Sequence, residues 1–252
     1  MSNEGHRTLM RTDRILDYVA RCDEPPTLSA LARSIDAPVS STQDLVRELC
    51  VLGYLTMTGK QYRLGLRPHM LGMIAGSATA SAVDHAELVR LSEVARAPIG
   101  IAALVGHEIY YLDHAGPRAP DHIQIVADDH RPRPTLRTAA GRLLLARADE
   151  PVRERILSGL RGDDPEGAAQ FQRELPTIRR DRLARSDGLA DPDIAAIAVL
   201  TTEATAAFVL FARRAPRRGR VPALESAARR LQNELGRLPG LSPSSSGALR
   251  SR

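Results

Sequence analysis

Residues 27–64, TLSALARSIDAPVSSTQDLVRELCVLGYLTMTGKQYRL, decide the fold of the first part of the chain. Thr27 stands in the N-cap position before four apolar residues at helical spacing, Leu28, Leu31, Ala32 and Ile35. Residues 36–38 are long enough only for a turn. A second helical pattern then runs to about Leu49, and Gly53 stops it.

Two strand candidates, residues 54–57 and 61–64, follow this helix pair and are joined by Thr58-Gly59-Lys60, which predicts a hairpin. Two helices joined by a tight turn and followed by a hairpin form a winged helix-turn-helix, whose helix after the turn enters the major groove of DNA. The alternative is a small helical domain that contacts another protein.

The ends of the neighbouring helices follow from capping residues. A helix over residues 12–22 is predicted with Thr12 as its N-cap. The helix after the turn begins either with Pro38 as its first helical residue or at Ser40, with Gln43 completing a capping box.

The rest of the chain predicts an α+β domain built on an antiparallel sheet. Strands are expected at residues 99–105, 108–113, 123–126, 194–200 and 206–212, and helices at 86–97, 138–148, 152–160, 166–184 and 222–238. The small-residue stretch 76–82 marks the boundary between the domains. We expect a winged helix-turn-helix at 1–66, a linker helix at 67–83, the second domain at 84–240 and a disordered tail at 241–252.

Composition excludes several classes of protein. The chain has 252 residues, 43% of them hydrophobic and 26% charged, which rules out disorder along its whole length. Cys22 and Cys50 are too few for a disulfide framework. No apolar run has membrane-spanning length and no signal region follows the start, so we expect a cytoplasmic protein with no membrane partner.

Signs of catalytic or metal chemistry are missing from the sequence. His107, His114, His122 and His130 are seven or eight residues apart, which does not match common zinc motifs. No nucleophile elbow, phosphate loop or dinucleotide fingerprint is present. We therefore expect no enzyme activity, no metal and no cofactor. The basic run at residues 213–220 either touches an acidic surface or is solvated loop charge.

Several motifs carry a resemblance to a known family. They are LSALAR (28–33), PVSST (38–42), GYL (53–55), YRLG (62–65), IYYLD (109–113) and PTLRTAAGR (134–142). With them the chain resembles the isocitrate lyase regulator (IclR) family of bacterial transcription factors. The resemblance implies a GAF-like effector-binding second domain, a homodimer or dimer of dimers, a near-palindromic double-stranded DNA operator and control by a small molecule.

The recognition helix departs from that family. The family usually has Lys and Arg where this chain has Val39 and Asp44, so the exposed helix face carries a net charge of −1. Phosphate contacts must then come partly from the wing and from an arm with Arg7, Arg11 and Arg14. The predicted DNA-binding residues are Thr27, Arg33, Ser40, Ser41, Gln43, Asp44, Arg47, Lys60, Tyr62 and Arg63.

The effector pocket departs as well, because few polar groups stand at the positions where the family gathers them. The predicted effector-binding residues are Tyr111, Thr138, Ala139, Gly141, Asp187 and Ala196. An acid-binding pocket needs several convergent donors. Either the ligand is more apolar than usual in the family, or the domain senses no ligand.

These observations predict a sequence-specific DNA-binding transcriptional regulator that is controlled by a small effector. One alternative is a winged-helix protein-interaction regulator that has lost DNA or effector binding, which the acidic helix face favours. The other is a metabolite-binding enzyme on a GAF-like fold, which the missing catalytic residues disfavour.

Overall fold

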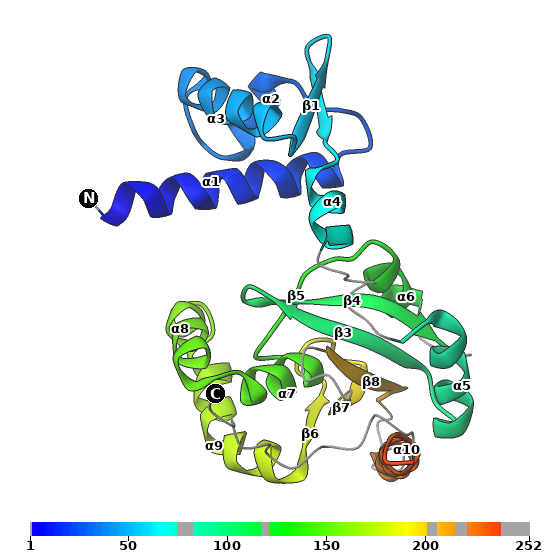
Figure 1. Cartoon of the computed structure of the whole chain (residues 1–252). Helices are drawn as coiled ribbons and strands as arrows, with labels where there is room; N and C mark the ends of the chain where they lie inside the picture. Colours follow the sequence, from blue (N-terminus) through cyan, green and yellow to red (C-terminus); the bar gives the residue numbers. More distant parts are fainter. Residues whose placement is uncertain (1, 75–82, 117–120, 201–205, 215–220, 238–252) are drawn as a thin grey trace, which may run out of the picture. The chain divides into compact units, whose positions relative to one another are not determined.

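The computed structural model describes residues 2–74, 83–116, 121–200, 206–214 and 221–237. The chain divides into two compact units, Met1–Thr79 and Ala80–Arg252 (Figure 1). The expected boundary at residues 76–82, the tail at 241–252 and most of the basic run 213–220 lie outside the described residues.

The first unit is a helix-turn-helix followed by a two-stranded wing. Its elements are α1 (Ser2–Arg21), α2 (Leu28–Ser34), α3 (Val39–Val51), β1 (Leu55–Thr58), β2 (Gln61–Leu64) and α4 (Arg67–Ile74). The wing strands are antiparallel, with Leu55 opposite Leu64 and Thr58 opposite Gln61. Thr27 caps α2 as predicted, since its hydroxyl accepts a hydrogen bond from the Ala30 amide at 3.4 Å. The order of elements predicted from the sequence is confirmed.

Two predicted helix ends were wrong. Helix α1 begins at Ser2, so Thr12 lies inside it and caps nothing. The early turns show no apolar pattern because they bury little: Leu9 is 67% exposed. Helix α3 begins at Val39 with Pro38 as N-cap and without a side-chain cap, and the hydroxyl of Thr42 donates to the Pro38 carbonyl at 2.9 Å.

The three helices and the wing enclose one small hydrophobic core. It contains Ile15, Val19, Leu31, Ile35, Val46, Leu49, Leu55 and Tyr62. Each of α1, α2, α3 and the wing contributes to it, so the core holds α3 and the wing in a fixed relation. The sequence pattern of the first helix of the pair predicted the burial of Leu31 and Ile35 by their helical spacing.

The second unit is built on a six-stranded antiparallel sheet in the order β5-β4-β3-β8-β7-β6. The strands are β3 (Ile99–Val105), β4 (Glu108–Ala115), β5 (Arg133–Pro134), β6 (Leu183–Asp187), β7 (Ile194–Leu200) and β8 (Ala206–Arg213). The central strands β3, β7 and β8 are buried along most of their length. The predicted α+β class with an antiparallel sheet is confirmed.

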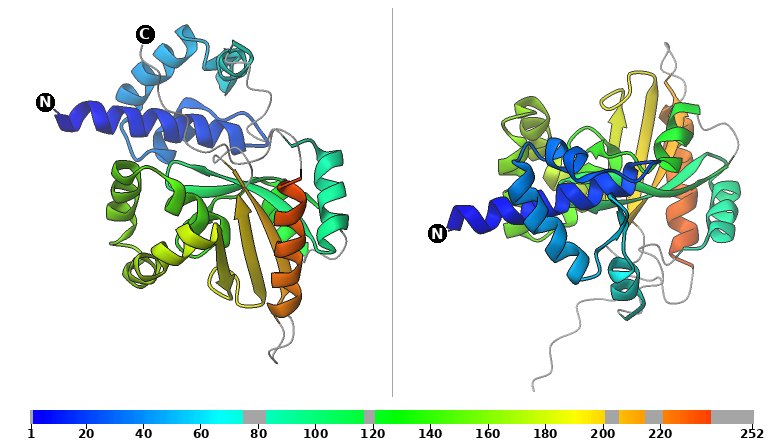
Figure 2. Two further views of the ribbon diagram at one scale, coloured as in Figure 1. Left: turned by 60° about the horizontal axis from the view of Figure 1, so that its bottom comes forward. Right: turned by 90° about the horizontal axis from the view of Figure 1, so that it is seen from above.

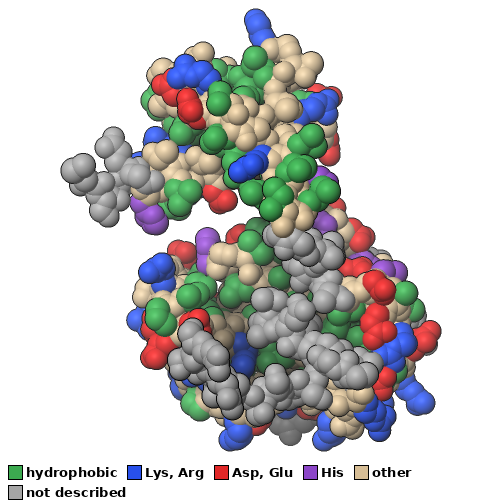
Figure 3. All heavy atoms as spheres, viewed as in Figure 1, with side chains coloured by type: hydrophobic (Ala, Val, Ile, Leu, Met, Phe, Trp, Pro, Cys, Tyr) green, Lys and Arg blue, Asp and Glu red, His purple; other side chains and the backbone are tan. Residues whose placement is uncertain are grey.

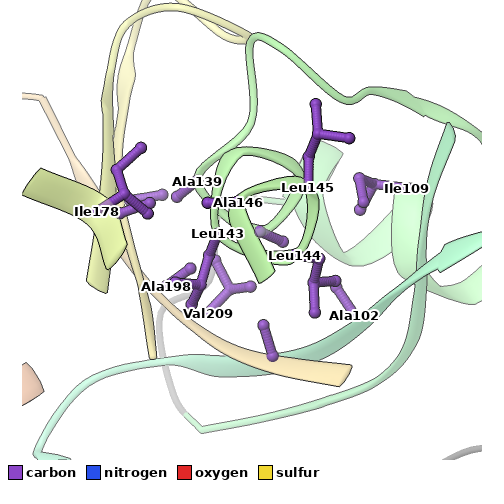
Figure 4. Packing of buried hydrophobic residues seen from close by; sticks show 14 of the residues in the cluster. Ala102, Ile109, Ala139, Leu143, Leu144, Leu145, Ala146, Ile178, Ala198 and Val209 are labelled. Atoms are coloured by element: carbon purple, nitrogen blue, oxygen red, sulfur yellow. The ribbon is translucent and has the colours of Figure 1, made fainter. Parts of the chain in front are cut away.

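Helices cover both faces of this sheet (Figures 1 and 2). Helices α5 (His85–Ala95) and α10 (Val221–Leu235) lie side by side on one face. The other face carries α7 (Ala139–Arg147), with α8 (Glu150–Leu160) and α9 (Pro165–Asp181) beyond it, and α6 (Asp121–Asp128) packs against β4. Figure 4 shows the packing around α7, where Leu143 points toward Ala198 of β7 and Val209 of β8.

Three segments differ from the sequence prediction. Residues 123–126, expected as a strand, lie in helix α6, because a run of four apolar-rich residues does not distinguish a strand from a helix. The predicted helix 166–184 ends at Asp181, where Arg182 takes a left-handed conformation, and strand β6 begins at Leu183. Strand β5 has two residues, too few to leave a pattern.

None of the helices in the described ranges has the length and apolar character needed to cross a membrane.

Candidate DNA-binding surface and effector pocket

Helix α3 presents a polar face to solvent. Its buried side consists of Thr42, Val46 and Leu49. Its exposed residues are Val39, Ser40, Gln43, Asp44, Arg47, Glu48 and Val51. Amide, carboxylate and guanidinium groups of this kind read base edges in the major groove.

An ion pair crosses this face. A guanidinium nitrogen of Arg47 lies 3.1 Å from a carboxylate oxygen of Asp44, one turn earlier. Both side chains are about two thirds exposed, 65% for Arg47 and 69% for Asp44. An ion pair this exposed contributes little to stability. The pair nevertheless offsets the positive charge of Arg47, the one cation of the exposed face of α3. This charge becomes available to DNA only when the two side chains separate.

Three other residues of the helix pair that were predicted to bind DNA form hydrogen bonds with nearby backbone groups. Ser41 is half-buried and donates from its hydroxyl to the Pro38 carbonyl at 3.1 Å. The Thr27 hydroxyl caps α2. Arg33 is exposed, and its Nε donates to the Ser29 carbonyl at 3.3 Å, which leaves the outer guanidinium nitrogens facing solvent.

The wing exposes two cations, Lys60 in the turn and Arg63 on β2. Tyr62, between them, lies in the hydrophobic core and is 8% exposed. Its amide donates to the Pro26 carbonyl at 2.9 Å, which ties the wing to the segment before α2. The ring of Tyr62 therefore positions the wing, and the prediction that it faces DNA does not fit its burial.

The basic residues of the expected arm lie on a helix. Arg7 and Arg14 are exposed on α1, and Arg11 is half-buried there. They are spaced along one regular helix of 20 residues, so they form a charged stripe and not an extended arm.

The second unit contains a pocket on the α7 face of the sheet. Its lining comes from five strands, the start of α7 and the loop between β6 and β7: Tyr111, Arg133, Thr138, Ala139, Ser186, Ala190, Asp191, Ile194, Ala196 and Phe211. The pocket has a volume of about 340 Å³ including its open mouth.

Two aromatic rings form one wall of the pocket. Tyr111 of β4 and Phe211 of β8 have ring centroids 5.6 Å apart, tilted by 54°. Gly100 of β3 lies between these strands, and a Cβ there would be 3.2 Å from both rings. Burial raises the pKa of the Tyr111 hydroxyl, which has no hydrogen-bond partner within the described part of the chain. It is therefore a neutral group available to a ligand.

The pocket also contains an ion pair. Arg133 of β5 and Asp191 of the β6–β7 loop approach to 2.6 Å, and their side chains are 18% and 22% exposed. These two residues lie 58 positions apart in the chain. Among the described residues of the lining, they are the only charged ones.

The two aliphatic hydroxyls of the pocket, those of Thr138 and Ser186, already donate to backbone carbonyls. Thr138 caps α7: its hydroxyl accepts from the Gly141 amide at 3.2 Å and donates to the Pro134 carbonyl at 3.1 Å. Ser186 donates to the Arg137 carbonyl at 2.8 Å. Each oxygen keeps a lone pair with which it can accept a hydrogen bond from a ligand.

Two predicted effector residues lie outside the lining. Gly141 is a packing residue, because a Cβ there would be 2.6 Å from the Cα of Thr135. Asp187 is exposed and forms an ion pair with Arg214 at 2.8 Å. Tyr111, Thr138, Ala139 and Ala196 do line the pocket.

Comparison with known proteins identifies the first unit. Residues 8–58 match the family model of the IclR helix-turn-helix domain. A curated protein of Cupriavidus necator, "Probable transcriptional regulator SauR", is 25% identical over 163 residues, which are 64% of this chain and 64% of the relative. The first unit is therefore similar to the IclR helix-turn-helix domain, and the chain is similar to a transcriptional regulator.

Solved structures of IclR-family proteins share the fold of this chain. An IclR regulator from Alicyclobacillus acidocaldarius superposes with a TM-score of 0.62 at 20% identity, covering 93% of this chain and 98% of the other. One from Brucella abortus gives 0.60 at 22% identity, covering 90% and 91%. An IclR homologue from Microbacterium hydrocarbonoxydans, solved with 4-hydroxybenzoate, gives 0.57 at 22% identity, covering 90% and 98%.

Several pocket residues could not be predicted from the sequence. Arg133, Asp191 and Phe211 come from β5, a loop and β8, and local periodicity carries no signal for their meeting. Ser186 was missed because β6 was not predicted as a strand. Among the described residues, no group of three or more His, Cys, Asp or Glu is placed to hold a metal ion.

Proposed function

We propose that this chain is a sequence-specific, DNA-binding transcriptional regulator of the IclR family that acts in the bacterial cytoplasm. The observation that carries the proposal is the exposed polar face of α3 beside a wing that exposes Lys60 and Arg63. In a winged helix-turn-helix the helix after the turn enters the major groove and specifies sequence, and cations beside it contact phosphates. We assign DNA binding to residues 1–66, linkage to 67–83 and effector binding to 84–240.

Within this proposal, Gln43 and Arg47 read bases, Asp44 accepts from a cytosine amine or keeps its ion pair, and Ser40 and Ser41 make short contacts. Arg33, Lys60 and Arg63 neutralise phosphates. Thr27 and Tyr62 act by placing α2 and the wing.

The proposal is tested by a mobility shift with the DNA upstream of the chain's own gene, at low and moderate salt. We expect Arg47→Ala and Arg63→Ala each to weaken binding by about 1 kcal/mol, roughly fivefold, because each removes one cation from a DNA-facing element. Arg161→Ala on the surface of the second unit is the matched control. Unchanged affinity in both variants would contradict the proposed docking, and no shift with the wild type would favour the protein-interaction alternative.

We also propose that the regulator is at least a dimer. Helix α4 buries none of its residues within the chain. Exposed apolar side chains gather on β2, α4 and the residues between them, as the green area beside α4 in Figure 3 shows: Leu64, Leu66, Met70, Leu71, Met73 and Ile74. A second copy of the chain would cover this surface. It would also supply a second winged helix, which would bind the other half of the operator. Light scattering at micromolar concentration should give at least twice 27.4 kDa, and a monomer would refute the proposal.

The proposed effector site is the pocket of the second unit. A related IclR homologue of the same fold holds 4-hydroxybenzoate. The aromatic wall and the few polar groups of this pocket suit a small molecule with an apolar ring. Tyr111, Thr138, Ala139 and Ala196 are the lining residues that the sequence and the structure both favour.

A further inference from the structure

The charge state of the effector follows from the ion pair in the pocket. Arg133 supplies the one cation of the lining, and the carboxylate of Asp191 is bound to it at 2.6 Å. Both side chains are about four fifths buried, so water screens them much less than it screens a surface pair. The positive charge in the pocket is therefore already matched by a carboxylate of the chain itself.

Neighbouring charges are matched as well. Arg137, just before Thr138, forms an ion pair with Asp164, and Arg214 pairs with Asp187 at 2.8 Å. The hydrogen bond from Arg137 holds the pKa of Asp164 below its usual range, so this carboxylate stays charged and keeps its partner. No unpaired cation is left at the described pocket for a second anion.

The loop that carries Asp191 is held in place independently of the pair. The Gly188 amide donates to the Ile194 carbonyl at 2.9 Å, and the Ile194 amide donates to the Asp191 carbonyl at 3.0 Å. The Arg214 amide donates to the Asp193 carbonyl. These backbone hydrogen bonds fix the position of the loop from which the Asp191 carboxylate reaches Arg133 of β5.

We propose that Asp191 is a built-in anion that occupies the carboxylate-binding position of Arg133, so that the pocket accepts uncharged ligands and rejects organic acids. This deepens the proposed effector site and rests on it. An acid would have to displace Asp191 and leave a carboxylate with little access to water and without a partner, which is costly. A neutral ligand keeps the pair, packs on Tyr111 and Phe211, and bonds to the Tyr111 hydroxyl.

The test compares probes of nearly equal shape that differ in charge: benzoate with benzamide, and acetate with acetamide. Binding is measured by calorimetry or ligand-observed NMR on the full chain without DNA. For the wild type we expect benzamide to bind more tightly than benzoate. For Asp191→Asn we expect benzoate affinity to rise about tenfold, because Arg133 is then free to form a charge-assisted pair with the ligand.

Asp187→Asn is the matched control, since it removes a carboxylate at the end of β6 that pairs outside the pocket. Asp191→Asn with Arg133→Gln should lose the gain in benzoate affinity. The proposal is overturned if the wild type prefers benzoate, or if Asp191→Asn binds benzoate no better than the wild type does. If Asp191→Asn does not fold, the comparison of benzamide and benzoate binding to the wild type is the deciding test. The proposal is also overturned if the wild type binds none of the four probes.

These measurements separate the inference from the function on which it rests. A chain that binds DNA but shows no difference between the charged and uncharged probes refutes the role of Asp191 and leaves the regulator intact. A chain that shows the charge preference but no mobility shift refutes DNA binding and leaves the pocket chemistry intact.

Discussion

Gly141→Ala should lower the free energy of unfolding of the second unit by about 3 kcal/mol, at the upper end of what overpacking costs. Gly141 lies in the first turns of α7, which packs on the sheet. A Cβ there would be 2.6 Å from the Cα of Thr135 and 2.7 Å from its carbonyl carbon. These are backbone atoms, and Thr135 is fully buried with its hydroxyl bound to the His107 carbonyl at 2.6 Å. Neither the backbone of α7 nor that of Thr135 can move to relieve this contact without a large cost in free energy.

Urea or thermal unfolding measures this effect, and Gly159→Ala is the matched control. Gly159 lies on α8 with no atom within 4 Å of its would-be Cβ. Alanine there should raise stability by about 1 kcal/mol, because it favours helix more than glycine does. If both variants have the same stability, α7 does not approach residue 135 as closely as the structure shows. Because Thr138 caps α7, Gly141→Ala should also impair the pocket.

Asp44→Arg should strengthen binding to random duplex DNA by about 2 kcal/mol, roughly thirtyfold at low salt. The substitution changes the charge of the exposed face by two units, and it removes the carboxylate that holds Arg47 at 3.1 Å. About one more phosphate is neutralised, so the salt dependence should become steeper by about one in slope. Fluorescence anisotropy at two salt concentrations measures both quantities.

Two controls give this prediction its meaning. Glu154→Arg makes the same change of net charge on the exposed surface of α8, and it should leave DNA affinity nearly unchanged. Asp44→Asn removes the carboxylate that holds Arg47 but adds no cation. It should therefore give a smaller gain in affinity for random DNA. If Asp44 reads a cytosine, Asn also loses discrimination at one base pair of the operator. If all curves coincide with the wild type, this face of α3 does not meet DNA.

The winged helix was predictable because its signals are local. Thr27 caps α2, Gly53 ends the helix after the turn, and the apolar positions of α2 and α3 recur at helical spacing. The antiparallel sheet was predictable because β3, β7 and β8 are continuous apolar runs. Residues 123–126 were mistaken for a strand because their pattern is short and equally compatible with a helix.

The pocket was only partly predictable, for a physical reason. Thr138 and Ala139 could be placed because the start of a helix leaves a capping signal. Arg133 and Asp191 are brought together by the path of the loops, and no regular spacing in the sequence links them. Considered alone, each would be predicted to be a charged residue on the surface. The Asp44–Arg47 pair was available from its spacing of three residues, yet which rotamers the two side chains adopt is decided by the structure.

The edges of the six-stranded sheet determine how copies of the second unit can associate. At one edge, β5 has only two residues, and Pro134 has no amide to donate to a further strand. At the other edge, β6 carries Arg185, which is held by Glu225 of α10 at 2.5 Å. Short strands, proline and charge are the means by which proteins prevent edge-to-edge pairing and aggregation. These features disfavour extension of the sheet at its edges, so we expect any assembly of this unit to use its helices and loops.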